Sequence, residues 1–135
     1  MRSTSIVTSF ITNDQKILLL KRSNQVKSMK CLWAGISGII ERGDETPLSR
    51  AKIEIFEEVG IKEDELKLLK SIQQLSIVSA QYKNHEWNIF PFLFSTKNME
   101  IKLNWENSEF KWIKPTEIAN YKTVPDLDKI LSNLL

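Results

Sequence analysis

The sequence predicts a mixed α/β or α+β domain, in which strands and helices are layered around one core. Segments that are apolar or β-branched, as in strands, are interspersed with segments of helical pattern. The length of 135 residues fits one domain, and 41% hydrophobic and 27% charged residues are typical of a globular protein. No repeat, low-complexity tract or linker composition marks a boundary, so we expect a single domain over residues 1–135.

The first half of the chain is expected to supply strands that lead into one helix. Residues 5–12 and 16–21 flank the turn signal Asn13-Asp14, which predicts two strands joined by a tight turn. A polar loop, one or two short strands and a charged loop are expected at residues 23–30, 31–40 and 41–45. Thr46 and Pro47 then predict the N-cap and first position of a helix that Gly60 ends.

The second half is expected to return to strands before it ends in helices. Residues 66–82 and 87–95 are predicted to be a pair of strands joined by a turn at 82–86, with His85 at the surface. A short strand is expected at residues 109–113. A short helix and a terminal helix should follow, at residues 115–121 and 126–135.

The helix at residues 47–59 has two distinct faces when its positions are turned by about 100° each. Its apolar face is formed by Leu48, Ala51, Ile55 and Val59. On another face three carboxylates cluster, from Glu54, Glu57 and Glu58. Such carboxylates repel one another unless they are solvated or hold a cation, and Mg²⁺ prefers oxygen ligands. An ordinary acidic solvent face is the alternative interpretation.

The context of this helix resembles the Nudix box. That family signature is a glycine, five residues, a glutamate and seven residues, followed by Arg-Glu-apolar-any-Glu-Glu-any-Gly-apolar. Residues 38–61 follow it, and residues 53–61 carry its second half. Weaker similarity at residues 17–22 and 109–118 extends the resemblance over most of the chain, which looks like the small archaeal or bacterial stand-alone type.

The resemblance implies a Nudix fold and a Nudix activity. The fold would be a mixed, partly curved β-sheet sandwiched between helices, with a loop-helix-loop catalytic motif. The activity would be that of a divalent-metal-dependent diphosphohydrolase, which cleaves a diphosphate linkage in a nucleoside diphosphate derivative. We expect a small nucleotide as substrate, because 135 residues leave little room for a further recognition domain.

The resemblance also assigns site residues. Glu57 and Glu58 are the expected metal ligands, with Glu54 as ligand or general base and Gly38 contributing a backbone carbonyl. A further acid is expected from a late loop, and we prefer Glu106 to Glu109. Mg²⁺ is the expected cofactor, with Mn²⁺ as the alternative.

Two departures from the signature bear on these roles. Ile53 replaces the arginine that orients the first catalytic glutamate in the family, and we hypothesise that Arg50 partly supplies the missing charge. One extra residue before Glu54 leaves either Asp44 or Glu45 to fill the upstream acidic position.

Further side chains are candidates for substrate binding. Arg22 suits phosphate oxygens, because a guanidinium donates paired hydrogen bonds. Aromatic faces can stack on a base, although each could equally belong to the core. The predicted substrate-binding set is Arg22, Trp33, Glu45, Arg50, Tyr82 and Trp87, with Phe90 as a further aromatic candidate.

Other features limit partners and location. A net charge of +2 gives no strong nucleic-acid signal, and the lack of a signal-like or membrane-spanning apolar run predicts the cytoplasm. Ile53 and Phe56 form a second apolar strip on the helix, covered either by the terminal helix or by a homodimer partner. A non-catalytic nucleotide-binding module is the main alternative function. An isoprenoid diphosphate isomerase that uses Cys31 is a weaker alternative.

Overall fold

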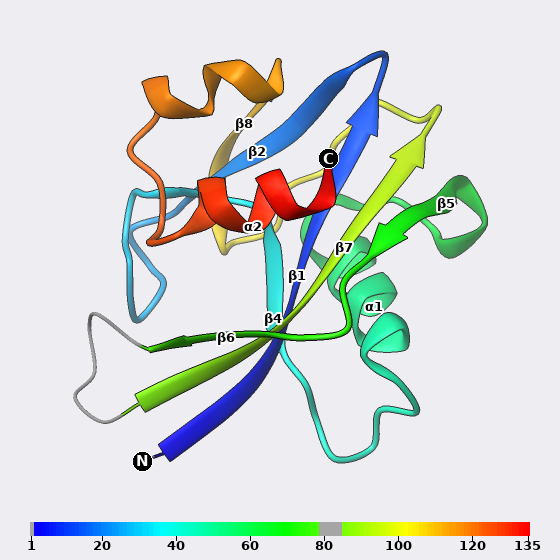
Figure 1. The fold of residues 1–135 in the computed structure, drawn as a ribbon. Coiled ribbons are helices and arrows are strands. Elements are labelled where there is room, and N and C mark those ends of the chain that lie inside the picture. The colour runs from blue at the N-terminus through cyan, green and yellow to red at the C-terminus, as the bar shows by residue number, and fades with distance from the viewer. Residues whose placement is uncertain (1, 79–84) are drawn as a thin grey trace.

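The centre of the fold is a pair of long parallel strands. A computed structural model describes residues 2–78 and 85–135, and Figure 1 shows their arrangement. Strands β1 (Arg2–Asn13) and β7 (His85–Thr96) pair in parallel over eleven consecutive positions. They form the middle of a sheet with the order β3-β2-β1-β7-β5.

The remaining strands pair antiparallel along these two. They are β2 (Lys16–Arg22), β3 (Trp33–Ala34), β4 (Ile36–Ile39), β5 (Leu66–Ser71), β6 (Leu75–Val78) and β8 (Asn107–Ile113). Strand β1 pairs with β2 at one end and with β4 further along, and β7 pairs with β5 and then with β6. The two central strands therefore change antiparallel partners along their length.

Side-chain alternation along the strands builds a core on each face of the sheet. In β2, Leu18 and Leu20 face the core beneath helix α1 (Pro47–Val59), whereas Ile17 and Leu19 face the core beneath helix α2 (Leu127–Leu134). Figure 1 shows α2 crossing in front of the central strands. The expectation of a mixed sheet between helices is therefore confirmed.

Helix α1 begins and ends where the sequence predicts. The Thr46 side chain accepts a hydrogen bond from the Ser49 backbone N–H at 3.1 Å, and Pro47 occupies the first turn. Gly60 ends the helix with φ 79°, a left-handed conformation that favours glycine. The predicted apolar face is also confirmed, because Ala51, Ile55 and Val59 are fully buried.

The predicted long strand at residues 66–82 is wrong in its described part, residues 66–78, and residues 79–82 lie outside the described residues. It is divided into β5 and β6, and the break falls opposite Pro91 of β7. The Pro91 carbonyl accepts a hydrogen bond from the Ile72 N–H at 3.1 Å, but a proline has no N–H to donate in return. Of the predicted turn at 82–86, residues 82–84 lie outside the described residues, and Glu86 belongs to β7.

His85 is buried, contrary to the surface position expected from the sequence. It is the first residue of β7, and its Nε2 lies 2.7 Å from the Thr4 hydroxyl. Three further boundaries differ by only a few residues from the prediction. β8 begins at Asn107, the short helix is a 3₁₀ turn at Pro115–Asn120, and α2 starts at Leu127. A second 3₁₀ turn spans Glu63–Glu65.

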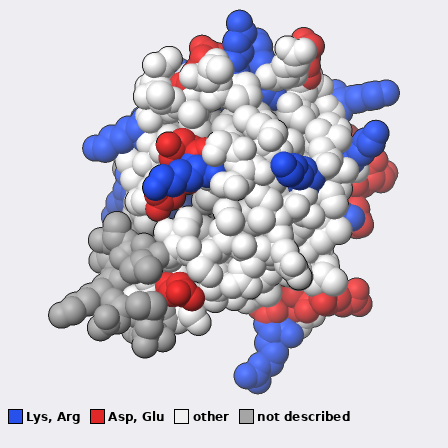
Figure 2. Space-filling model, viewed as in Figure 1, with Lys and Arg blue, Asp and Glu red and all other residues white. Residues whose placement is uncertain are grey.

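The second apolar strip of α1 is not covered by α2, because the two helices pack against opposite faces of the sheet. Ile53 and Phe56 are 41% and 54% exposed, so the expectation that the terminal helix covers them is wrong. On the face shown in Figure 2, Lys and Arg side chains are scattered, with several Asp and Glu side chains among them, over an otherwise uncharged surface. Among the described residues, neither helix is long and apolar enough to cross a membrane.

Candidate active site

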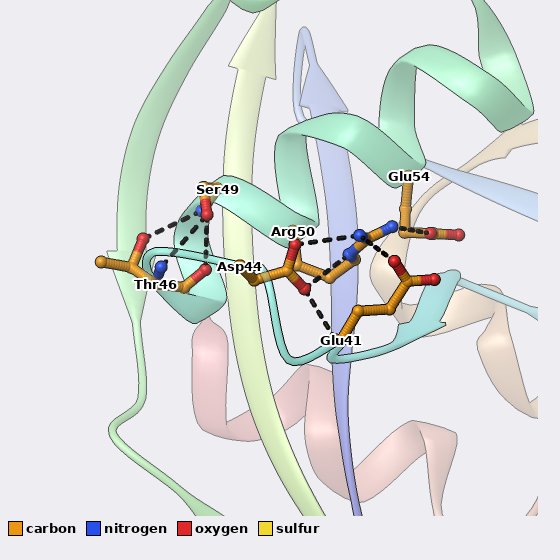
Figure 3. Close-up of polar contacts among 6 residues, drawn as sticks. All are labelled: Glu41, Asp44, Thr46, Ser49, Arg50 and Glu54. Atoms are coloured by element: carbon orange, nitrogen blue, oxygen red, sulfur yellow. Dashed lines mark hydrogen bonds and ion pairs between the residues drawn. The ribbon is translucent and has the colours of Figure 1, made fainter.

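Arg50 is the hub of a network of carboxylates at the start of α1 (Figure 3). Its Nε and Nη2 donate to both oxygens of Asp44 at 2.8 and 2.9 Å. Nη1 donates to Glu54 and Nη2 also to Glu41, each at 3.0 Å. The bidentate Asp44 pair raises the pKa of Arg50 and lowers that of Asp44. Arg50 is only 8% exposed, and its guanidinium joins the loop residues Glu41 and Asp44 to helix α1.

Of Asp44 and Glu45, the two candidates for the upstream acidic position, Asp44 is the one that the Arg50 network includes. Asp44 contacts Arg50 and also accepts a hydrogen bond from the Glu41 N–H at 2.7 Å, whereas Glu45 is exposed. Arg50 lies one helical turn before Glu54 and forms an ion pair with it. This contact is the one that the hypothesis requires, in which Arg50 supplies part of the charge lost by Ile53. This geometry gives no support to the predicted substrate-binding roles of Arg50 and Glu45, since four of the five N–H donors of Arg50 bond to carboxylates and Glu45 is exposed.

Glu54 lies in a cradle formed by the end of β4. A Cβ added at Gly38 would stand 2.3 Å from Glu54 Cδ and 2.6 Å from its Oε1, so only glycine leaves room for this side chain. Burial raises the pKa of Glu54, opposed by the hydrogen bond from Arg50. Gly38 and Glu54 therefore lie together as predicted, and the β4 backbone passes close to the carboxylate.

Glu58 is buried rather than solvated. It follows Ala51 by seven residues, about two helical turns, so it leaves α1 on nearly the same side as that buried residue. Its Oε1 accepts a hydrogen bond from Asn107 Nδ2 at 3.1 Å. Burial raises its pKa well above the usual range, and the Asn107 bond opposes this effect. Within the described chain, Glu58 Oε2 is buried and has no hydrogen-bond partner.

The other predicted acids divide into near and far groups. Glu106 lines the same cavity as Glu54, and its charge raises the pKa of both Glu54 and Glu58. Its carboxylate is held by Asn104 Nδ2 at 3.1 Å. Glu57 is exposed on the outer flank of α1, although its charge also raises the pKa of Glu54. Glu109 points away, exposed and paired with Lys21 at 3.4 Å.

A cavity of about 430 Å³ extends from this acidic cluster towards the start of α2. Its polar end contains Arg22, whose Nε and Nη2 both donate to the Ser28 carbonyl, at 3.3 and 3.1 Å. Its apolar end lies between the sheet and α2. That end is lined mainly by Ile6, Ile77, Trp87, Ile89, Leu127 and Ile130.

The predicted aromatic residues fall in three different places. Trp87 lines the cavity. Trp33 is a core residue, 9% exposed, with its ring centroid 5.2 Å from that of Tyr121, so this geometry gives no support to its predicted stacking role. Phe90 packs against the core beneath α1, and Tyr82 lies outside the described residues.

The residues present fit a divalent cation in their donor chemistry. Glu54, Glu57 and Glu58 offer carboxylate oxygens, and the unpartnered Glu58 Oε2 is the feature that a hard cation would explain. Among the described residues, no three acidic, histidine or cysteine side chains converge into a ready-made cage. Instead, Arg50 donates a hydrogen bond to Glu54, and Asn107 donates one to Glu58.

Two residues of the site were missed by the sequence analysis. Glu41 reaches Arg50 across a loop, and the only signal was its place in a charged segment after Gly38. Asn107 lies just before the strand predicted at residues 109–113, and nothing in the local sequence indicates that it meets Glu58.

Comparison with known proteins identifies the class to which this fold and site belong. A model of the NUDIX domain matches residues 2–134. The nucleoside triphosphatase NudI of Escherichia fergusonii is 31% identical over 131 residues, covering 90% of this chain and 89% of that protein. The MutT protein from Methanosarcina mazei has a TM-score of 0.75 at 20% identity, over 98% of this chain and 92% of that one. A C. elegans Ap4A hydrolase has a TM-score of 0.73 at 14% identity, over 98% and 93% of the two chains.

The molecule is thus a Nudix-type diphosphohydrolase with the fold of that class. The chain belongs to the Nudix family, as the residues around Gly38 and Glu54 indicated.

Proposed function

We propose that this protein hydrolyses a diphosphate linkage in a small nucleotide with the help of a divalent metal ion. Two observations carry the proposal: Glu54 and Glu106 line a cavity that is acidic at one end and apolar at the other, and Glu58, on the same helix as Glu54, has a buried carboxylate oxygen without a hydrogen-bond partner. A phosphate chain with bound cation suits the acidic end, and a base suits the apolar end.

In this proposal the acids of α1 hold the cation. Glu58 and Glu57 would hold it, with Glu54 as a further ligand or as the general base, and a backbone carbonyl near Gly38 would complete the set. A Mg²⁺ or Mn²⁺ ion held by these residues would supply Lewis-acid chemistry, by polarising a phosphoryl oxygen and lowering the pKa of a water molecule. Glu106, which lines the same cavity as Glu54, is the second candidate to accept a proton.

The chain's own residues also orient the substrate. Arg22 lines the polar end, and its Nη1 remains available to a phosphate after Nε and Nη2 bind Ser28. Trp87 offers a ring at the apolar end, where a base could stack. The similarity to nucleoside triphosphatase NudI makes nucleoside triphosphates the first compounds to test.

Arg50 is a positioning residue in this scheme. It bonds Glu54 from one helical turn away and is itself fixed by Asp44 and Glu41. In this scheme Arg50 orients the Glu54 carboxylate. It supplies the positive charge that the signature places at position 53, where this chain has Ile53.

The test is turnover on a panel of nucleoside triphosphates, ADP-ribose, nucleotide sugars and dinucleoside polyphosphates, with wild type beside Glu57→Gln. Glu57 is exposed, so the variant should fold normally. We expect turnover that EDTA abolishes and that the variant lowers by orders of magnitude. No turnover on any compound, with nucleotide still bound, would favour a non-catalytic module instead.

Three finer expectations accompany the proposal. Cys31 is exposed and does not line the cavity, which argues against an isomerase that uses this thiol. A homodimer that covers Ile53 and Phe56 stays a prediction, to be tested by light scattering. The cytoplasmic location and the single-domain organisation over residues 1–135 also stay predictions.

A further inference from the structure

Asn107 and Glu58 form a buried polar pair that the roles assigned above leave unexplained. The two side chains are 7% and 4% exposed, and they come from elements 49 residues apart in the chain. Asn107 Nδ2 donates to Glu58 Oε1 at 3.1 Å, while Oε2 of the same carboxylate has no partner among the described residues. The bond therefore distinguishes the two oxygens of one carboxylate.

A β-bulge explains why Asn107 faces α1 at all. Along β8, Trp112 pairs with Leu18, and both pack against the α1 core, so the even-numbered residues of β8 face α1. Regular alternation would turn Asn107 to the opposite face of the sheet. The pairing shifts between Lys21 and Arg22, so that Arg22 pairs with Asn107 and one extra residue is absorbed. This shift brings Asn107 to the α1 side, as bulges beside functional sites commonly do.

Asn107 is also held firmly from its own side. The preceding carbonyl, of Glu106, accepts a hydrogen bond from the Ser23 N–H at 2.8 Å, and Asn107 itself pairs with Arg22 in the sheet. The donor is therefore fixed by β2, while the acceptor is fixed by the last turn of α1.

We propose that Asn107 is a positioning residue that engages one oxygen of Glu58 so that the other is presented to the divalent cation. The proposal rests on the metal site of the proposed function and adds a specific role for Asn107. With Oε1 accepting a hydrogen bond from Asn107, Oε2 is the oxygen of Glu58 that has no hydrogen-bond partner among the described residues, and the side chain is kept in one rotamer. Partners of this kind change metal affinity when they are removed.

The experiment measures Mn²⁺ binding to the metal-free protein by electron paramagnetic resonance, with no substrate present. We expect Asn107→Leu to raise the Kd for Mn²⁺ by about tenfold or more. The matched control is Asn98→Leu, because Asn98 Nδ2 donates to the Glu65 carboxylate at 2.9 Å, away from the site. Asn98→Leu should leave the Kd unchanged, and thermal unfolding of each variant checks that it is folded.

A double-mutant cycle tests whether Asn107 acts through Glu58. In a Glu58→Gln background, Asn107→Leu should cause no further change in the Kd. An equal loss in that background, or wild-type affinity in folded Asn107→Leu, would overturn the proposal. If Asn107→Leu does not fold, Asn107→Ser is measured instead. The shorter serine side chain cannot reach Glu58, and it disturbs the surroundings less.

The same measurements separate this inference from the proposed function. Weaker Mn²⁺ binding in Asn107→Leu, together with no hydrolysis of any phosphoanhydride by the wild type, would uphold the inference and contradict the hydrolase. Hydrolysis by the wild type with unchanged Mn²⁺ binding in Asn107→Leu would do the reverse.

Discussion

Replacing Gly38 by alanine adds one methyl group at the point where β4 touches the Glu54 side chain. The new Cβ would lie 2.3 Å from Glu54 Cδ and 2.4 Å from Cγ, whereas carbon atoms in contact stay about 3.5 to 4.0 Å apart. Glu54 must therefore withdraw by roughly 1 Å or more, which also strains its 3.0 Å hydrogen bond with Arg50.

A catalytic group displaced by about 1 Å can cost roughly 100-fold in rate. We therefore expect Gly38→Ala to lower kcat/KM by about 100-fold, which corresponds to about 2.7 kcal/mol. The assay is steady-state hydrolysis of the best substrate from the panel, with urea unfolding to verify stability. Alanine is acceptable to the β4 backbone, because Gly38 does not have a positive φ.

Gly43→Ala is the matched control for this substitution. Gly43 lies in the loop of the same signature, and a Cβ there meets nothing within 4 Å. Its kcat/KM should match that of the wild type. Wild-type kcat/KM in Gly38→Ala would refute the reasoning, because it would mean that Glu54 does not act from the position described.

Three further predictions concern the surrounding charges. Arg50→Lys should lower kcat more than it changes KM, because one ammonium cannot replace the fork that joins Asp44 to Glu54; unchanged kcat would remove the positioning role. Glu106→Gln should lower kcat/KM by about tenfold or more, whereas Glu109→Gln should stay close to wild type; the opposite order would reverse our choice of acid. Because Arg50 lowers the pKa of Asp44, the Asp44 contribution to stability is present above the usual value of about 3.9 and is lost as pH falls through the lower folded pKa. In urea unfolding, the stability difference between wild type and Asp44→Asn should shrink with acidification, and a constant difference would contradict this linkage.

The helix and its chemistry were largely predictable from the sequence. The caps at Thr46 and Gly60, the apolar face and the grouping of acids all follow from local rules. The family resemblance, carried by residues 38–61, was confirmed by the match to the NUDIX domain. Helical periodicity did not determine how deeply each acidic side chain of α1 is buried. Glu58 was grouped with Glu54 and Glu57 on one acidic face, although it follows the buried Ala51 by about two helical turns and is itself buried.

Aromatic residues show a second limit of sequence analysis. Trp33 and Trp87 have the same ring chemistry and were both candidates for base stacking. Only Trp87 lines the cavity, because Trp33 packs against Tyr121 beneath the chain that leads into α2. Which of two similar rings faces a cavity depends on the elements that cover each of them, and these lie far away in the sequence.

The sequence by itself therefore determined the helix, its carboxylates and the family, since helical geometry is fixed by hydrogen bonds between residues four apart. Only the tertiary structure decided how those carboxylates are held. Arg50 meets Glu41 and Asp44 through the fold of a loop, and Asn107 reaches Glu58 through a bulge in strand pairing. The physical reason is that the face of a strand residue depends on its register with a partner strand, and a shift of one residue reverses it.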